Sequence, residues 1–309
     1  MVIPRKWPIY PAETAPSRAD CAQPVQLAKF AQLAMGVMVG DIPLSLDGIN
    51  ERGLAGAVFY YPSHAHYPPP VAGKAPLDPS FALQYALSTC ADLAEVERMF
   101  RDKTTLSVTM PSDGTTHHLH FLFSDLTGEA MVIEPDAEGL KIYRNTIGVL
   151  TNSPGYCWQE TNIRNYLGVS REPRQPFIME GHNFQQISAN AALWGLPGDY
   201  SSVSRFVKTA YLKRFVEQPQ NEADCVTTAF HVLSAVSVPR FGVGRDEAEA
   251  GYTMYTAAMS ACSRSYYFHT YENRRIQAAS LEREDLDAAE IKFYKWSDEQ
   301  DIAWRGNHS

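Results

Sequence analysis

The stretch HHLHFLFSDLTGEAMVIEPDAEGLKIYRNTIGVLTNSP, residues 117–154, decides the fold class of this chain. Four apolar segments in it are separated by clusters of turn-forming residues at 125–128, 136–139 and 144–145. Asp, Asn and Gly are the residues that tight hairpin turns require. Because hairpin turns join antiparallel neighbours, the stretch predicts a β-meander within an antiparallel sheet.

Further strands are expected on both sides of this meander. Residues 31–62 read as two apolar strands around a turn at Asp47, Gly48, Asn50 and Gly53. Residues 251–281, near the end of the chain, again read as strands. Antiparallel strands therefore account for the beginning, the middle and the end of the sequence.

Helices are predicted between these groups of strands. The clearest spans residues 78–103, with Asp78 as N-cap, Pro79 at the first helical position and a restart near Asp92. Others are expected at 155–170, at 201–215 and at 221–239, the last two capped by Ser201 or Ser202 and by Asn221. With no repeat or long linker, the order predicts one α+β domain over residues 1–309.

Composition limits the class of protein. The chain has 309 residues, 45% of them hydrophobic, with a net charge of −8 and a pI near 5.6. An acidic chain of this kind is not expected to bind nucleic acid or anionic membranes. No run approaches the ~18 apolar residues of a membrane helix, and the opening MVIPRKWPIYPAET has no apolar core of a signal peptide.

Cysteine usage favours a reducing, cytoplasmic location. The count is odd, the spacing is irregular and no CxxC motif occurs, which argues against a disulfide framework. We expect Cys90 on the apolar face of a helix, Cys157 at the beginning of another, and Cys225 and Cys262 at core positions. The fifth cysteine is Cys21.

Four spaced motifs carry a resemblance to a known family. They are GINERGLAGAVFYYP (48–62), IGVLTNSP (147–154), GLPGDYSSVSRFVKTAYL (195–212) and YTMYTAAMSACSRSYYF (252–268). Together, and in this order, they resemble the choloylglycine hydrolase family, which contains bile salt hydrolases and penicillin V acylases. The resemblance extends over nearly the whole chain.

The resemblance implies a fold and an activity. The fold would be the four-layer αββα sandwich of N-terminal-nucleophile hydrolases, with two stacked antiparallel sheets and helices outside. The reaction would be hydrolysis of a linear amide in a small acyl-amide substrate, without metal or cofactor, in a homotetramer. In the family, removal of the initiator Met exposes a Cys whose thiolate attacks the carbonyl while its own α-amine handles the proton.

The resemblance also assigns three site residues. Asn152 matches the asparagine whose side-chain amide donates to the oxyanion, Arg205 matches the active-site arginine, and the backbone N–H of Tyr60 would complete the oxyanion hole. From the residues alone, Asn152 could instead form an Asx-turn, Arg205 could lie on a solvated helix face, and Tyr60 could pack in the core. We predict that Asn152 and Arg205 face one pocket with Tyr60 close by.

The nucleophile is the departure from the family pattern. Met1 is followed by Val2 rather than Cys, and the strands that would carry the nucleophile are expected to be missing. A late start, a truncated sequence and a non-catalytic, ligand-binding relative are the explanations considered, and the chain as written is expected to be inactive. Cys21, released by cleavage after Asp20, is disfavoured because Pro24 would interrupt a central strand.

A metal-dependent hydrolase is the alternative from another class. His118 and His120 would share one face of a strand, and two imidazoles at that spacing can bind zinc. No third ligand follows in a recognisable motif, so surface histidines at the beginning of a strand are the preferred interpretation. Substrate preference is expected to depend on the loops at 62–75 and 172–194.

Overall fold

A seven-stranded antiparallel sheet forms the centre of the protein. The computed structural model describes residues 1–9, 26–40, 42–107, 117–187, 192–240, 251–295 and 297–305. The strand order is β1-β4-β5-β6-β9-β10-β11, and every pair in it is antiparallel. The strands are β1 (Val2–Ile3), β4 (Gln32–Val39), β5 (Ile42–Asn50), β6 (Ala55–Tyr60), β9 (Leu119–Ser124), β10 (Ala130–Asp136) and β11 (Gly139–Tyr143).

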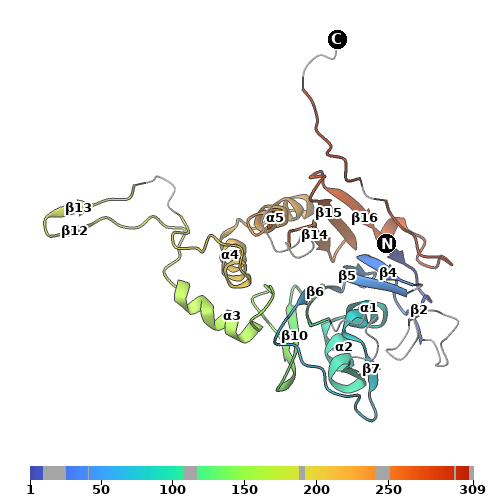
Figure 1. The fold of residues 1–309 in the computed structure, drawn as a ribbon. Helices are drawn as coiled ribbons and strands as arrows, with labels where there is room; N and C mark the ends of the chain where they lie inside the picture. The colour runs from blue at the N-terminus through green and yellow to red at the C-terminus, as the bar shows by residue number, and fades with distance from the viewer. Residues whose placement is uncertain are drawn as a thin grey trace.

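A smaller sheet of three strands packs on one half of the large sheet. It contains β14 (Tyr255–Ser260), β15 (Ser265–Thr270) and β16 (Gln277–Ser280), paired antiparallel. Leu33, Met35 and Ile49 from the large sheet share one buried cluster with Tyr266 and Phe268 from the small sheet. The two sheets are therefore stacked face to face through an apolar layer (Figure 1).

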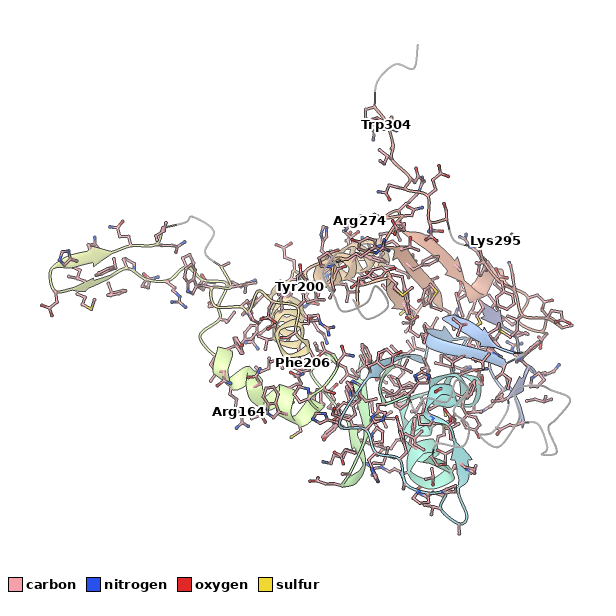
Figure 2. The ribbon with its side chains drawn as sticks, viewed as in Figure 1. Arg164, Tyr200, Phe206, Arg274, Lys295 and Trp304 are labelled. Carbon is pink, nitrogen blue, oxygen red and sulfur yellow. The ribbon has the colours of Figure 1, made fainter. Side chains whose placement is uncertain are left out.

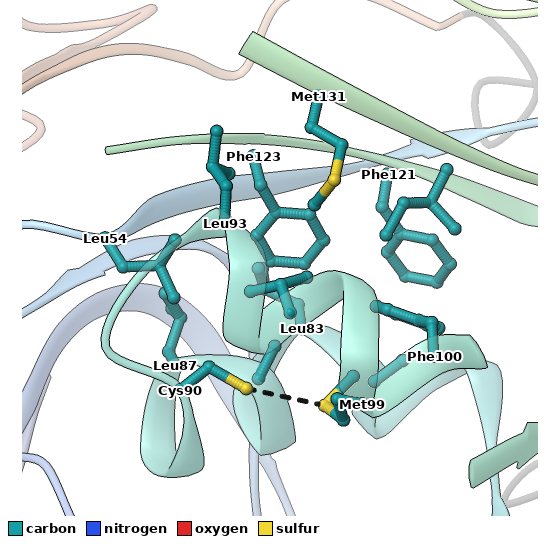
Figure 3. Close-up of a cluster of buried hydrophobic side chains, with 14 of the residues drawn as sticks. Leu54, Leu83, Leu87, Cys90, Leu93, Met99, Phe100, Phe121, Phe123 and Met131 are labelled. Atoms are coloured by element: carbon teal, nitrogen blue, oxygen red, sulfur yellow. Dashed lines mark hydrogen bonds between the residues drawn. The ribbon is translucent and has the colours of Figure 1, made fainter. Parts of the chain in front are cut away.

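Two helices cover the outer face of the large sheet. Asp78 accepts a hydrogen bond from Ser80 N at the beginning of a 3-10 turn, Pro79–Phe81, as the capping pattern predicted. This 3-10 turn continues into helix α1 (Ala82–Thr89), and helix α2 (Leu93–Arg98) follows. Their apolar faces pack on β9 and β10 through a buried cluster that includes Leu83, Phe123 and Met131 (Figure 3). Burial of this cluster from water is the main force that holds the layer.

Helices also cover the opposite side of the molecule. Helix α5 (Glu222–Ser234) contacts β14, and α4 (Ser202–Phe215) lies beside α5 (Figure 1). Asn221 caps α5 and Ser201 caps α4 through their side-chain oxygens. The layers are thus helix, sheet, sheet and helix, which confirms the predicted αββα sandwich.

Shorter elements complete the described chain. Strands β7 (Ala75–Leu77) and β8 (Thr104–Leu106) form a parallel pair, and β2 (Pro8–Ile9) pairs with β3 (Gln26–Leu27). The others are a π-helical turn (Met99–Lys103), α3 (Tyr156–Asn162), 3-10 turns at Ile163–Tyr166 and Leu281–Arg283, and the strands β12 (Phe177–Met179) and β13 (His182–Phe184).

The predicted turn within residues 31–62 is partly wrong. Asp47, Gly48 and Asn50 lie in strand β5 rather than in a turn, and the region holds three strands, β4, β5 and β6. The chain reverses just after Asn50, whose Oδ1 accepts from the backbone N–H groups of Arg52 and Leu54. Polar residues that resembled turn chemistry are accommodated in the strand because their side chains find buried partners.

Residues 172–194, predicted as an irregular loop, include a β-hairpin. Strands β12 and β13 pair only with each other, and the hairpin projects far from the body of the molecule (Figure 1). Its apolar side chains, Phe177, Ile178, Met179 and Phe184, are exposed. Strands of three residues with no buried face carry no alternation pattern, so sequence periodicity could not reveal them.

The described cysteines are all unpaired. Cys90 is buried, which raises the pKa of its thiol to about 11, and Cys157 is the second residue of α3, as predicted. Cys225 and Cys262 are exposed, so their assignment to the core was wrong. Cys21 lies outside the described residues. Within the part of the chain that is described, no helix combines the length and apolarity needed to cross a bilayer.

Candidate active site

Asn152 follows a short buried segment that fixes its position. Val149 and Leu150 belong to an apolar cluster with Phe206 of α4. Thr151 Oγ1 donates to the Ser202 carbonyl at 3.0 Å, which ties this segment to the beginning of α4. The next residue, Asn152, therefore leaves the core at a defined point beside α4.

Arg205 lies in α4, whose first turn is fixed by hydrogen bonds. Ser201 Oγ accepts from Ser204 N at 3.3 Å, and Asp199 accepts from Ser201 N at 2.9 Å and from Ser204 Oγ at 2.6 Å. These donors hold the pKa of the Asp199 carboxyl well below its usual range. Phe206 points from α4 toward α3 (Figure 2), where it packs on Tyr156. The helix cannot rotate without losing these contacts.

The structure brings together Asn152, Tyr60 and Arg205, which we name the Asn152 cluster. Asn152 Nδ2 donates to the Tyr60 carbonyl at 2.9 Å, and Arg205 donates to Asn152 Oδ1 at 2.7 Å. The Arg205 Nε–H group also donates to the Tyr200 carbonyl at 3.0 Å. Arg205 therefore lies beside Asn152 with Tyr60 close by, while the catalytic roles of the three residues stay a prediction.

Tyr60 exposes its backbone to the site because of its place in β6. Tyr61 N donates to the His118 carbonyl of the neighbouring chain segment at 2.7 Å. Backbone groups alternate sides along an antiparallel strand, so the N–H and C=O of Tyr60 point away from β9. On that side the described pairing with β5 ends at Ala57. The Tyr60 side chain is 63% exposed, which excludes the core packing considered from sequence.

A cavity of about 630 Å³ lies against this cluster. Tyr60 and Arg205 line it, together with His117 and Asp47, whereas Asn152 is not among the lining residues. Of the two residues predicted to face one pocket, the cavity wall therefore includes only Arg205. The rest of the wall is mainly apolar and comes from β5, β6, β14 and the end of α5, with Leu44, Leu46, Val58, Phe59, Leu233, Val236, Met254 and Met259. A volume between ~300 and ~1,000 Å³ is typical of small-molecule sites.

Asp47 is a buried acid on the cavity wall that sequence reasoning missed as a site residue. Tyr255 Oη donates to Asp47 Oδ2 at 2.6 Å, and Tyr266 Oη donates to Oδ1. Burial raises the pKa of the Asp47 carboxyl to about 6, although both tyrosine hydroxyls and the Met1 ammonium favour the carboxylate. The Met1 ammonium itself donates to the Ala34 carbonyl at 2.7 Å. Asp47 and its two tyrosines join the two stacked sheets.

His120 is not part of a metal site in this structure. Its ring is completely buried, with Nδ1 2.9 Å from Glu134 Oε1 and Nε2 2.7 Å from the Thr151 carbonyl oxygen. Both nitrogens are thus occupied, and the described residues contain no group of three or more possible metal-binding side chains. The expectation of surface histidines also fails for His120, because a buried carboxylate partner on β10 is not visible from local sequence.

Comparison with known proteins identifies the family. The sequence profile of the linear amide C–N hydrolases of the choloylglycine hydrolase family matches residues 1–294. The chain belongs to the choloylglycine hydrolase family. The match covers both sheets, the helices on their outer faces and the Asn152 cluster, so the resemblance stated from the four motifs is confirmed.

Individual members of the choloylglycine hydrolase family are moderately similar in sequence. A bile salt hydrolase/transferase of Clostridium perfringens is 31% identical over 270 residues, which cover 87% of this chain and 82% of the relative. A bile salt hydrolase/transferase of Lactiplantibacillus plantarum is 31% identical over 265 residues, covering 86% and 82%.

Solved structures support the choloylglycine hydrolase fold. A mutant of the conjugated bile acid hydrolase from Clostridium perfringens superimposes with a TM-score of 0.85 at 28% identity, covering 98% of this chain and 90% of that one. Penicillin V acylase from Agrobacterium tumefaciens gives a TM-score of 0.68 at 19% identity, covering 92% and 78%, and at that identity supports the fold alone.

Proposed function

We propose that this chain acts on conjugated bile acids, cleaving the amide bond between the steroid acid and its amino acid. The observation that carries the proposal is the Asn152 cluster at the wall of a largely apolar cavity. Amide hydrolysis needs hydrogen-bond donors around the carbonyl oxygen of the substrate, and an apolar surface nearby that binds the acyl group. Relatives named as bile salt hydrolases narrow the substrate class.

In this proposal two N–H groups stabilise the oxyanion. Asn152 Nδ2 carries two hydrogens, and its bond to the Tyr60 carbonyl uses one of them. The second is available for the substrate carbonyl oxygen, together with the backbone N–H of Tyr60. One such donor contributes about 10²–10³-fold to kcat, because the charge on the oxygen is larger in the transition state than in the substrate.

Arg205 has two roles in the proposal. It holds Asn152 Oδ1, and it places a positive charge beside the cavity. Its hydrogen-bond acceptors, Asn152 Oδ1 and the Tyr200 carbonyl, are neutral, and none of the described salt bridges includes it. Such a cation favours a thiolate, the developing oxyanion and the anionic end of a glycine or taurine conjugate.

The nucleophile in the proposal is a cysteine thiolate, as the family resemblance implies. It adds to the amide carbonyl, the tetrahedral intermediate expels the amine with a proton, and water then hydrolyses the thioester. Two sources for this cysteine are testable: Cys21, and a cysteine that begins a segment placed before Val2. We expect the second, and we expect the 309-residue chain by itself to turn over poorly.

The test measures release of glycine and taurine from conjugated bile acids. The 309-residue chain, its Cys21→Ser variant and a form with an N-terminal segment beginning with Cys are compared. Turnover only in the extended form supports the proposal. Turnover of the 309-residue chain that Cys21→Ser abolishes would make Cys21 the nucleophile. Binding of the conjugates with no turnover in any form would instead indicate the ligand-binding relative.

Penicillin V-like acyl amides are the second candidate substrate. The observation that favours them is Tyr60, since the resemblance places Tyr here in penicillin V acylases and Asn in bile salt hydrolases. The exposed Tyr60 ring lies on the cavity wall, where an aryl group could stack on it. Phenoxyacetate release from penicillin V, measured in the same forms of the protein, distinguishes the two substrate classes.

We also propose that the chain is a cytoplasmic homo-oligomer, a tetramer as the resemblance implies. The projecting β12–β13 hairpin exposes Phe177, Ile178 and Met179 to solvent, and a second copy is the partner proposed for this surface. A reducing compartment is consistent with the unpaired cysteines of the described chain.

A further inference from the structure

A buried ionisable pair lies directly behind the Asn152 cluster. His120 on β9 and Glu134 on β10 are 0% and 1% exposed, and their Nδ1 and Oε1 atoms are 2.9 Å apart. Tyr61, the residue after Tyr60, stacks on the His120 ring with 4.4 Å between ring centroids and 5° between planes. The mechanism described above gives this pair no role.

The partners of the pair determine where its protons lie. His120 Nε2 is 2.7 Å from the Thr151 carbonyl, which only accepts, so Nε2 carries a hydrogen. Tyr156 N, in the first turn of α3, donates to both carboxylate oxygens of Glu134, at 2.9 and 3.0 Å. These bonds hold the Glu134 carboxyl group in place. Nδ1 of His120 and Oε1 of Glu134 share one hydrogen, so every polar atom of the two side chains is hydrogen-bonded.

The pair contacts both segments that carry the oxyanion donors. Through Nε2 it holds the carbonyl of Thr151, which is bonded covalently to Asn152. Through the face of the ring it holds Tyr61, which is bonded covalently to Tyr60. The other titratable groups acting around Glu134 and Tyr61 are Tyr143, Asp136 and Lys141.

We propose that the buried, hydrogen-bonded pair of His120 and Glu134 positions the Asn152 amide and the Tyr60 backbone N–H for the same substrate oxygen. His120 and Glu134 are positioning residues, since they act through Thr151 and Tyr61. The hydrogen bonds of the pair stand on the contacts alone, whereas the positioning role rests on the proposed function. A misplacement of donors by about 1 Å costs on the order of 10²-fold in rate.

The first test is nuclear magnetic resonance of the 309-residue protein with ¹⁵N in its histidine rings. We expect one of the nine histidines to show a ring N–H that exchanges slowly with water, because both of its ring nitrogens are buried and hydrogen-bonded. That signal should disappear in His120→Gln and exchange faster in Glu134→Gln. If no histidine ring N–H of the unmodified protein is protected from exchange, the buried hydrogen-bonded pair is excluded, and no variant is needed for that result.

The second test follows the Asn152 side-chain amide signals, assigned through Asn152→Ala. We expect Glu134→Gln to shift them, and Glu51→Gln to leave them unchanged. Glu51 is the matched control because it also accepts a backbone N–H, from Ala31 at 2.8 Å, and an arginine, Arg5, away from the cluster. Unchanged Asn152 signals in a folded Glu134→Gln protein would overturn the positioning role.

Kinetics separate this inference from the proposed function. In a form that turns over, Glu134→Gln should lower kcat on the order of 10²-fold and leave KM unchanged, with no effect of Glu51→Gln. A loss confined to KM, or no loss, contradicts positioning. If no form turns over, the proposed function fails, while the ring-nitrogen and Asn152 signals still decide whether the buried pair forms and whether it affects Asn152.

Discussion

Arg205 donates a hydrogen bond to Asn152 Oδ1 at 2.7 Å, and this bond determines which end of the Asn152 amide faces Tyr60. A guanidinium has only donors, so the amide oxygen must turn toward it. The amide nitrogen then faces the Tyr60 carbonyl at 2.9 Å. The proposed oxyanion site requires N–H groups, and Arg205 selects the orientation of the Asn152 amide that this proposal needs.

Replacing Arg205 by Met should therefore impair catalysis more than binding. Asn152 Oδ1 loses a charged donor, and such hydrogen bonds contribute about 1.5–3 kcal/mol. We expect kcat to fall about 10–150-fold in a form that turns over. Arg214→Met, on the same helix, is the control and should have no effect. Equal kcat values for the two variants would show that Arg205 does not support Asn152 in catalysis.

Asp47 should make stability depend on pH. Its folded-state pKa of about 6 lies above the ordinary 3.8, so the folded protein holds this proton more tightly than the unfolded chain. The stabilising contribution is present below pH 4 and is lost as pH rises to about 6, by roughly 3 kcal/mol.

Urea unfolding of the unmodified protein and of Asp47→Asn measures this effect. Asparagine keeps a similar shape without the charge, so the variant should gain stability relative to the unmodified protein between pH 4 and 7. Asp102, whose carboxylate is exposed, supplies the control. For Asp102→Asn, the difference in unfolding free energy from the unmodified protein should not change with pH. A constant difference for Asp47→Asn as well would show that burial does not shift its titration.

Gly155 should tolerate no side chain. A Cβ built there would lie 2.6 Å from Tyr61 Oη and 3.0 Å from Glu134 Oε2, both held in the interior. We expect Gly155→Ala to lower the free energy of unfolding by about 1–3 kcal/mol, as overpacking does. Gly168→Ala, which meets nothing within 4 Å, is the matched control. Similar melting temperatures for the two variants would contradict the close packing at Gly155.

The hairpin β12–β13 should control assembly. Ile178, in strand β12 of the hairpin, is 75% exposed. The substitution Ile178→Asp places a charge in the proposed contact with a second copy. We expect light scattering to show a smaller mass than for the unmodified protein. Leu167→Asp changes a residue that is 78% exposed outside the hairpin and should leave the mass unchanged. A single-copy mass before any substitution would refute the proposal.

Local signals in the sequence predicted most of the fold. The meander of β9, β10 and β11 follows from turn residues, and the caps at Asp78, Ser201 and Asn221 follow from side-chain oxygens that bond to nearby N–H groups. Each of these depends on residues within a few positions. The family motifs added the long-range arrangement, and with it the meeting of Asn152 and Arg205.

Features that depend on distant neighbours could not be predicted. Asp47 resembled a turn residue because its partners, Tyr255 and Tyr266, lie more than 200 positions away along the chain. His120 resembled a surface histidine because Glu134 reaches it only across the sheet. Cys225 looked like a core residue because an apolar helix pattern does not indicate which side another layer will cover.

The separate pairing of β12 with β13 has a consequence for how this protein could diversify. No strand of the hairpin is shared with the sheets that carry the cavity. Insertions, deletions or altered surface chemistry in the hairpin would leave the strand register of both stacked sheets untouched. Selection could therefore change the surface of the hairpin while conserving the cavity, and protein engineers could shorten or replace the hairpin for the same reason.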